Sequence, residues 1–154
     1  AIHNLGANSQ GRRATVADLD LIVPLFDAYR QFYRLRSDVP AARRFLSDRL
    51  EQSESVVFLA FCGDSAVGFT LLYPSFSSGA MAPILILNDL FVDPAARRPG
   101  VGSALLEAAA EHGGQAGARS LKLATELGNA TAHAVYERMG WRRDTEFCTY
   151  WRVL

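Results

Sequence analysis

The stretch Leu87-Asn-Asp-Leu-Phe-Val-Asp-Pro-Ala-Ala-Arg-Arg-Pro-Gly-Val-Gly-Ser-Ala-Leu-Leu-Glu107 decides the fold. An apolar run ends at Asp93-Pro94, a polar turn follows with Arg97 and Arg98, and a helical pattern begins after Gly100. The pattern therefore predicts a strand, a basic glycine turn and a helix.

Such a junction suits an anion. The first turn of a helix leaves its backbone N–H groups without intrahelical partners and carries the positive end of the helix dipole. Gly100 and Gly102 have no Cβ, so a bulky anion can approach the backbone, and Arg97 and Arg98 add charge. We expect a phosphate or pyrophosphate here. The alternative is an ordinary turn with solvated arginines, and neither a Walker loop nor a full dinucleotide fingerprint is present.

Length and charge narrow the class of protein. The 154 residues suit one domain, so we expect a lead-in over residues 1–11 and a single domain over residues 12–154. Sixteen basic and sixteen acidic side chains cancel, which removes the global electrostatic argument for a nucleic acid or an anionic membrane as partner. Any anion site must therefore be local.

Nothing in the sequence indicates a membrane segment or a metal centre. No apolar run is long enough to span a bilayer, and the first eleven residues lack the features of a signal peptide. Cys62 and Cys148 have no metal-ligand spacing to His3, His112 or His133. We expect a cytoplasmic protein without a metal and with reduced cysteines, although the sequence leaves a disulfide open.

The first half of the chain alternates between apolar runs and helical patterns. Thr15 and Asp18 have capping-box spacing before a helix in which Pro24 predicts a kink or a boundary. Residues 74–83 are rich in serine and predict a rim loop. The elements expected here are strands over residues 12–15, 56–61, 66–73 and 84–92, a hairpin turn over 62–65, and helices over 19–33 and 40–50.

The second half continues the alternation. The helix after Gly100 is expected to end at Gly113, and residues 120–125 form a strand, which makes a right-handed parallel crossover. Asn129 caps a last helix that Gly140 ends. Residues 141–143 and 145–153 predict two closing strands.

Two motifs in this order resemble the GCN5-related N-acetyltransferase (GNAT) superfamily. They are Arg97-x-x-Gly100-x-Gly102 after a strand ending Leu-Phe-Val-Asp-Pro94, and Asn129-x-x-Ala132-x-x-x-Tyr136-x-x-x-Gly140-Trp141. The resemblance covers residues 84–143 and is strongest to the small-amine/polyamine and histone-acetyltransferase-like branch. It implies an α/β (α+β) fold: a mixed, mostly antiparallel sheet of six to seven strands, with helices on both faces and a central parallel pair splayed for acetyl-CoA.

The resemblance implies acetyl-CoA as co-substrate. Its pyrophosphate would lie on the turn from Arg97 to Ser103, with Pro99, which has no N–H, pointing away. Its pantetheine arm would follow the strand edge like an added strand. The implied cofactor-binding residues are Leu90, Phe91, Val92, Arg97, Arg98, Gly100, Val101, Gly102, Ser103, Asn129 and Tyr136.

The resemblance also implies catalytic roles. A backbone N–H at Leu90 would stabilise the charge that develops on the thioester oxygen. Tyr136 matches the tyrosine that protonates the leaving thiolate, although a core aromatic residue is the other interpretation. Asn129 would cap its helix and contact the cofactor.

The general base is open. Asn88 stands where amine-acetylating relatives often carry a glutamate, and an amide cannot act as a base. Asp89 is the nearest carboxylate, but strand alternation turns it to the opposite face from Asn88 unless the strand bulges. Asp89 therefore has a structural, substrate-binding or catalytic role, and a water chain to Glu126 is an alternative.

Acceptor specificity is expected from less patterned segments and from the strand before the turn: Tyr29, Tyr33 and the loop to Asp38, the rim loop, the turn before the last strand, and Asn88 with Asp89. Aromatic rings and carboxylates suit a cationic amine. The function that the resemblance implies is transfer of an acetyl group to a small primary amine by direct attack in a ternary complex, in a homodimer. The alternatives are a protein lysine or N-terminal acetyltransferase and a non-catalytic acyl-CoA-binding module.

Overall fold

The computed structural model describes residues 11–97 and 100–154. The chain divides into two units, Ala1–Leu123 and Ala124–Leu154, and each is described by itself. The predictions for residues 1–10, for Arg98 and for Pro99 lie outside the described residues.

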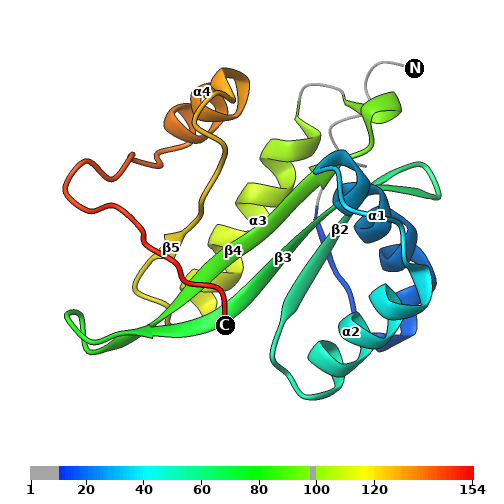
Figure 1. Ribbon diagram of the computed structural model, residues 1–154, viewed down its shortest axis with the longest axis horizontal. Helices are drawn as coiled ribbons and strands as arrows, with labels where there is room; N and C mark the ends of the chain where they lie inside the picture. Colours follow the sequence, from blue (N-terminus) through cyan, green and yellow to red (C-terminus); the bar gives the residue numbers. More distant parts are fainter. Residues whose placement is uncertain (1–10, 98–99) are drawn as a thin grey trace. The chain divides into compact units, whose positions relative to one another are not determined.

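The first unit is built on a mixed sheet with the order β1-β2-β3-β4-β5 (Figure 1). The first four strands are antiparallel to their neighbours, and β5 is parallel to β4. This confirms the mixed, mostly antiparallel class, although the described residues form five strands instead of six or seven. The strands are β1 Arg12–Arg13, β2 Val56–Cys62, β3 Ser65–Ser77, β4 Ala82–Val92 and β5 Leu121–Lys122.

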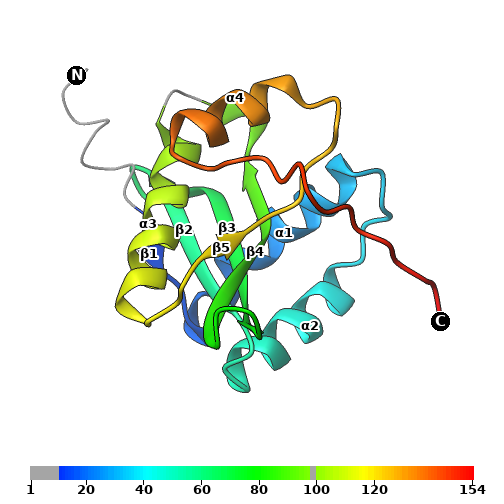
Figure 2. The same ribbon diagram turned by 90° about the vertical axis from the view of Figure 1, so that its left-hand side faces the viewer.

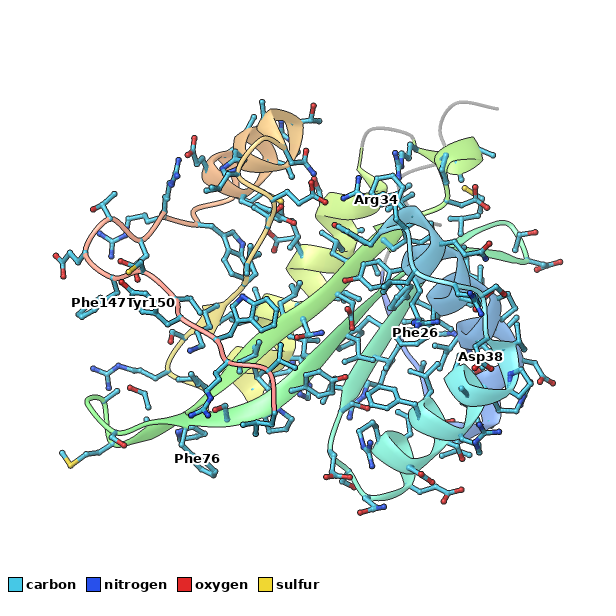
Figure 3. All side chains as sticks on the ribbon, viewed as in Figure 1. Phe26, Arg34, Asp38, Phe76, Phe147 and Tyr150 are labelled. Atoms are coloured by element: carbon cyan, nitrogen blue, oxygen red, sulfur yellow. The ribbon has the colours of Figure 1, made fainter. Side chains whose placement is uncertain are left out.

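Helices cover both faces of this sheet. α1 (Leu19–Phe32) and α2 (Val39–Glu51) lie on one face and α3 (Val101–Gln115) on the other (Figures 1 and 2). The main core lies between the first two helices and the sheet, and Phe26 points into it (Figure 3). Complete burial of one such large apolar side chain contributes about 1.5–3 kcal/mol. The fully buried members of this core are Ile22, Val23, Leu46, Val57, Leu59, Phe69 and Leu71.

Side chains cap the short 3-10 helix before α1, as the sequence predicts, and also the start of α2, where the sequence analysis names no cap. The Ala17 N–H donates to Thr15 Oγ1 at 3.2 Å and the Thr15 N–H donates to Asp18 Oδ2 at 2.9 Å, which completes the capping box of the short 3-10 helix Val16–Asp18 before α1. The Ala41 N–H donates to Asp38 Oδ1 at the start of α2. These bonds satisfy N–H groups that the helices leave unpaired.

A helix boundary at Pro24, one of the two alternatives that the sequence left open, is not observed, and the predicted helix end at Gly113 is wrong. α1 runs through Pro24 without a boundary, and because Pro24 is exposed, the Asp20 carbonyl that loses its partner lies on the solvent side. α3 continues through Gly113 to Gln115. A Cβ on Gly113 would lie 3.3 Å from Leu121 Cδ1, so this glycine allows the helix to pack close to the sheet.

The predicted rim loop over residues 74–83 is also wrong, because β3 and β4 continue as a two-stranded ribbon. Pro74 pairs with Leu85, and the last pair is Ser77 with Ala82, so only four residues remain for the turn. The pairing of β3 with β2 ends at the pair Leu72 with Val56. Pro74 lies beyond this pair, so its missing N–H removes no hydrogen bond between β3 and β2. Phe76 extends from the ribbon and is 81% exposed (Figure 3).

The second unit contains α4 (Ala130–Arg138). Asn129 Oδ1 accepts from the Ala132 N–H at 3.1 Å, and Gly140 follows the helix at φ 92°, as predicted for the two ends. The predicted closing strands over residues 141–143 and 145–153 are wrong, since this segment has no strand. A strand requires a hydrogen-bonding neighbour. Phe147 and Tyr150 are exposed on this segment (Figure 3).

The segment between α1 and α2 is fixed by Asp27. Its carboxylate accepts from the Ser37 hydroxyl at 2.6 Å and from the Asp38 N–H at 3.0 Å. Gln31 Nε2 donates to it at 3.0 Å. These donors, Ser37 first, lower the pKa of the buried Asp27 carboxyl despite its burial.

Asp27→Asn tests this anchor. An amide keeps the shape but exchanges one accepting oxygen for a donor, so we expect a loss of about 1–3 kcal/mol at pH 7. Because the folded pKa is depressed, the stabilisation is present above the unfolded value near 3.9 and is lost as the pH falls through the folded value. Urea unfolding from pH 7 to pH 3 should show the deficit shrinking in acid. The exposed Asp48→Asn is the control, and equal stabilities at pH 7 would contradict the assignment.

Candidate active site

β4 contains a bulge at Asn88. Leu71 pairs with Asp89 and Leu72 with Leu87, so Asn88 is the extra residue between them. Asn88 Nδ2 donates to Asp89 Oδ1 at 3.2 Å, and the two side chains lie together. In a regular strand Asn88 and Asp89 would point to opposite faces. The structure instead shows the bulged strand that the sequence analysis gave as the exception.

Among the residues that the structure describes, no strand pairs with β4 beyond the bulge on the edge that faces β5, and we call this edge open. The parallel pairing covers only Leu85 with Leu121 and Ile86 with Lys122, so β5 is shorter than the predicted strand over residues 120–125. The Asp93 N–H donates to the Val67 carbonyl at 2.7 Å, toward β3. By strand alternation, the N–H groups of Leu90 and Val92 face the open edge. An added extended ligand could bond to them.

Asp89 is a buried carboxylate, 5% exposed, on the α1 face of β4. The Tyr29 hydroxyl and the Asn88 amide donate to it. Burial raises the pKa of Asp89, and these two hydrogen bonds oppose that effect. Burial, with the nearby Asp89 charge, raises the pKa of Tyr29 and raises the pKa of Tyr73 to about 12. Both phenols are therefore neutral donors near pH 7.

Tyr29, which donates to this carboxylate, belongs to a cluster of aromatic rings. The Tyr33 ring lies edge-on to Tyr29 with centroids 5.0 Å apart, so the structure brings this predicted acceptor residue to the same cluster. Phe91, a predicted cofactor residue, has its side chain buried in the cluster, 6.1 Å from Tyr29. Arg97 lies over the Phe32 ring at 5.1 Å, and its Nε donates to the Val92 carbonyl at 3.1 Å.

The first turn of α3 has the features of an anion site. Gly100 has φ 101°, a conformation that favours glycine, and no side chain caps the helix there. A Cβ on Gly102 would meet no atom of the described residues within 4 Å, so contacts among these residues do not require a glycine at this position. Val101 is buried, and Ser103 follows in the same turn. These residues fit the phosphates of a nucleotide cofactor.

The second unit carries the remaining predicted site residues. Asn129 caps α4, and the Tyr136 ring lies 6.1 Å from the Trp141 ring. The Trp141 N–H donates to the Tyr136 carbonyl at 2.9 Å, which fixes the end of the motif. Glu126 is the other carboxylate considered as a base. Its backbone carbonyl oxygen accepts a hydrogen bond from His133 Nε2 at 3.0 Å.

Sequence reasoning missed two contributions to the site. Thr70 Oγ1 donates to the Asp89 carbonyl at 2.8 Å beside the bulge, and no motif marks Thr70. The bond from Tyr29 to Asp89 joins two elements 60 positions apart in the sequence, so local spacing could not reveal it. Its only signal was an aromatic residue with a polar end on a buried helix face.

Neither a membrane helix nor a metal cluster occurs in the part of the chain that the structure describes. Across residues 11–97 and 100–154, no helix has the length and apolar character needed to cross a bilayer. The same residues hold no group of three His, Cys, Asp or Glu side chains arranged for a metal ion. Both cysteines are free thiols.

A bulged strand with an open edge beside a glycine-rich helix start defines an acyl-CoA-dependent transferase of the GNAT type. The chain belongs to the acetyltransferase (GNAT) family, which matches residues 22–141, and it is an N-acetyltransferase. It is 49% identical to the uncharacterised N-acetyltransferase YhfO of Bacillus subtilis (strain 168), over 90% of this chain and 93% of the relative. It is 31% identical to an aminoglycoside N(6')-acetyltransferase type 1 of Stenotrophomonas maltophilia, over 70% of this chain and 72% of the relative.

Solved structures agree with this assignment. A crystal structure described as a probable acetyltransferase has a TM-score of 0.88 and 39% identity, covering 94% of this chain and 97% of that one. The aminoglycoside N-acetyltransferase AAC(6')-Iy in complex with CoA shares the fold, with a TM-score of 0.78 and 20% identity, covering 93% of each chain.

Asp89→Asn tests the electrostatic cost of the buried carboxylate. Because the folded pKa is raised, the wild type loses stability as the pH rises from the unfolded value near 3.9 through the folded value. The variant lacks this loss, so its Tm at pH 7 should exceed that of the wild type by about 2–4 °C, the effect of roughly 1 kcal/mol. The gap should close near pH 4 in calorimetric scans. A Tm below that of the wild type at pH 7 would contradict this reading.

Proposed function

We propose that the chain transfers the acetyl group of acetyl-CoA to the primary amine of a small cationic molecule by direct attack in a ternary complex. The observation that carries the proposal is the pairing, on one bulged strand, of an open backbone edge at Leu90 with a buried carboxylate at Asp89. The CoA complex of a protein with the same fold and an aminoglycoside-acetylating relative support the co-substrate and the acceptor class.

The proposed cofactor contacts follow from the two open features of the first unit. Acetyl-CoA supplies the activated acetyl group. The N–H groups of Val101, Gly102 and Ser103 at the start of α3 bind its pyrophosphate, with Arg97 contributing charge. The edge of β4 holds the pantetheine arm, and the Leu90 N–H binds the thioester oxygen and stabilises the charge that develops there.

The proposed proton transfers use two side chains. Asp89 attracts the acceptor ammonium, whose pKa is about 10.4, and takes the proton that the nitrogen must lose before it attacks the thioester carbon. The C–N bond forms as the C–S bond breaks. Tyr136, assigned from its motif, gives a proton to the departing sulfur, and Asn129 contacts the cofactor. The products are the N-acetylated amine and the free thiol of CoA.

A thiol-release assay with acetyl-CoA tests the function directly. The panel holds polyamines, amino acids, aminoglycosides and lysine peptides. We expect turnover with small cationic amines, whereas turnover with peptides alone would favour a protein acetyltransferase. Asp89→Asn should depress turnover of alkyl amines more than turnover of hydrazides, which are already neutral at pH 7. Saturable CoA binding without turnover of any amine would favour a non-catalytic acyl-CoA-binding module.

Tyr136→Phe tests the proposed acid. Loss of the hydroxyl should lower kcat by about 10²-fold or more, the usual range for general acid catalysis. The Kd of CoA, measured by calorimetry, should stay within about twofold because the ring remains. An unchanged kcat would remove Tyr136 from the chemistry.

Gly102→Ala separates cofactor binding from stability. The added Cβ meets nothing within 4 Å and improves helix propensity, so we expect up to about 1 kcal/mol of added stability. The same methyl group narrows the approach to the N–H groups, and the Kd of CoA should rise about tenfold or more. Gly114→Ala is the matched control, since its Cβ also meets nothing but lies in the last turns of α3. Equal CoA affinity in both variants would place the pyrophosphate elsewhere.

A further inference from the structure

We propose that Tyr29 is a positioning residue for the acceptor side of the reaction, because its hydroxyl holds the Asp89 carboxylate in the orientation that receives the amine. The inference rests on the proposed function and deepens it by assigning a role to a residue of α1 that does not belong to either sequence motif.

The geometry places the Tyr29 hydroxyl with little freedom. Its ring is packed among four others, with centroids 5.0 Å from Tyr33, 5.8 Å from Phe69, 6.1 Å from Phe91 and 6.4 Å from Phe26. Phe69 is completely buried. A donor held by packing orients its acceptor more strictly than a mobile side chain does.

The two side chains of the described residues that are seen to donate to the Asp89 carboxylate are both neutral. Tyr29 donates from α1 and Asn88 from the bulge. The other titratable groups that act on this cluster are Tyr33 from α1 and Tyr73 from β3, with Arg49 from α2 acting on Tyr73. None of the three ion pairs formed by the described residues includes Asp89. Its negative charge is therefore not neutralised by a cation of the described chain.

This arrangement differs from a structural carboxylate, which is usually paired when it is buried. Two neutral hydrogen bonds use about half of the accepting positions of a carboxylate. The remaining positions and the full negative charge stay available for an ammonium group. An arginine in place of Tyr29 would hold the carboxylate equally well but would neutralise the charge and repel the substrate.

The competing role for Tyr29 is a plain tie between α1 and β4. Both roles predict that loss of the hydroxyl lowers stability. They differ in the pH dependence of catalysis, because a donor to the ionised form lowers the pKa of the acceptor. The acid limb of kcat/KM for the amine reports the proton affinity of Asp89 in the free enzyme.

The experiment is a pH profile of Tyr29→Phe from pH 5 to pH 9 with the best amine of the panel. Loss of the donor should move the acid limb up by about one pH unit, equivalent to one hydrogen bond. At pH values below that limb, kcat/KM for the amine should fall about tenfold, and the KM of acetyl-CoA should stay within about twofold. Phe26→Leu is the control, since it loosens the same ring cluster without removing a donor to Asp89.

A second substitution keeps the test decisive if Tyr29→Phe does not fold. Site-specific 3,5-difluorotyrosine at position 29 has nearly the same shape and is a stronger donor, so the acid limb should move down. Superimposable profiles for the wild type and either Tyr29 substitution would overturn the inference while leaving the proposed function in place. A wild type that acetylates no amine would instead overturn the proposed function.

Discussion

The bulge at Asn88 in β4 is the constraint on which the rest of the site depends. One extra residue in the strand turns Asn88 and Asp89 toward each other instead of to opposite faces. Thr70 Oγ1 bonds to the Asp89 carbonyl at this irregular point and so compensates for the disturbed ladder. Beyond it, regular alternation returns, and Leu90 and Val92 present their N–H groups to the open edge. A regular strand would separate these features.

The local features of the fold could be predicted because their causes lie within a few residues. The Thr15 capping box, the Asn129 cap and the positive φ of Gly140 each depend on near neighbours. Gly113 shows the opposite case. A glycine near the end of an apolar pattern usually ends a helix, but here it is retained inside α3, where Leu121 and Leu85 lie against it. Only the packed structure distinguishes the two uses.

The candidate site could be predicted where a motif specifies the backbone, and not where two distant elements meet. The spacing of the motif identified Gly100 and Gly102. The structure shows a different reason for a glycine at each position: Gly100 has a positive φ, and the space around Gly102 is open among the described residues. From the sequence, the bulge at Asn88 could be stated only as a possibility, because the residue at which β4 bulges depends on its pairing with β3. The ribbon over residues 74–83 was missed because serine and proline weaken strand propensity even where cross-strand pairing determines the outcome.

Asp89 also explains why the absence of a glutamate at position 88 does not deprive the strand of a carboxylate. The bulge puts the Asn88 amide on Asp89 as a donor, so the residue that cannot act as a base supports the neighbour that we propose as the base. A buried carboxylate without a cation costs stability, and proteins commonly keep such groups where function requires them. In this chain the cost is reduced by a phenol and an amide, which leave the charge intact. The same two donors therefore make the carboxylate tolerable in the free protein and leave its charge for the cationic amine that we propose as acceptor.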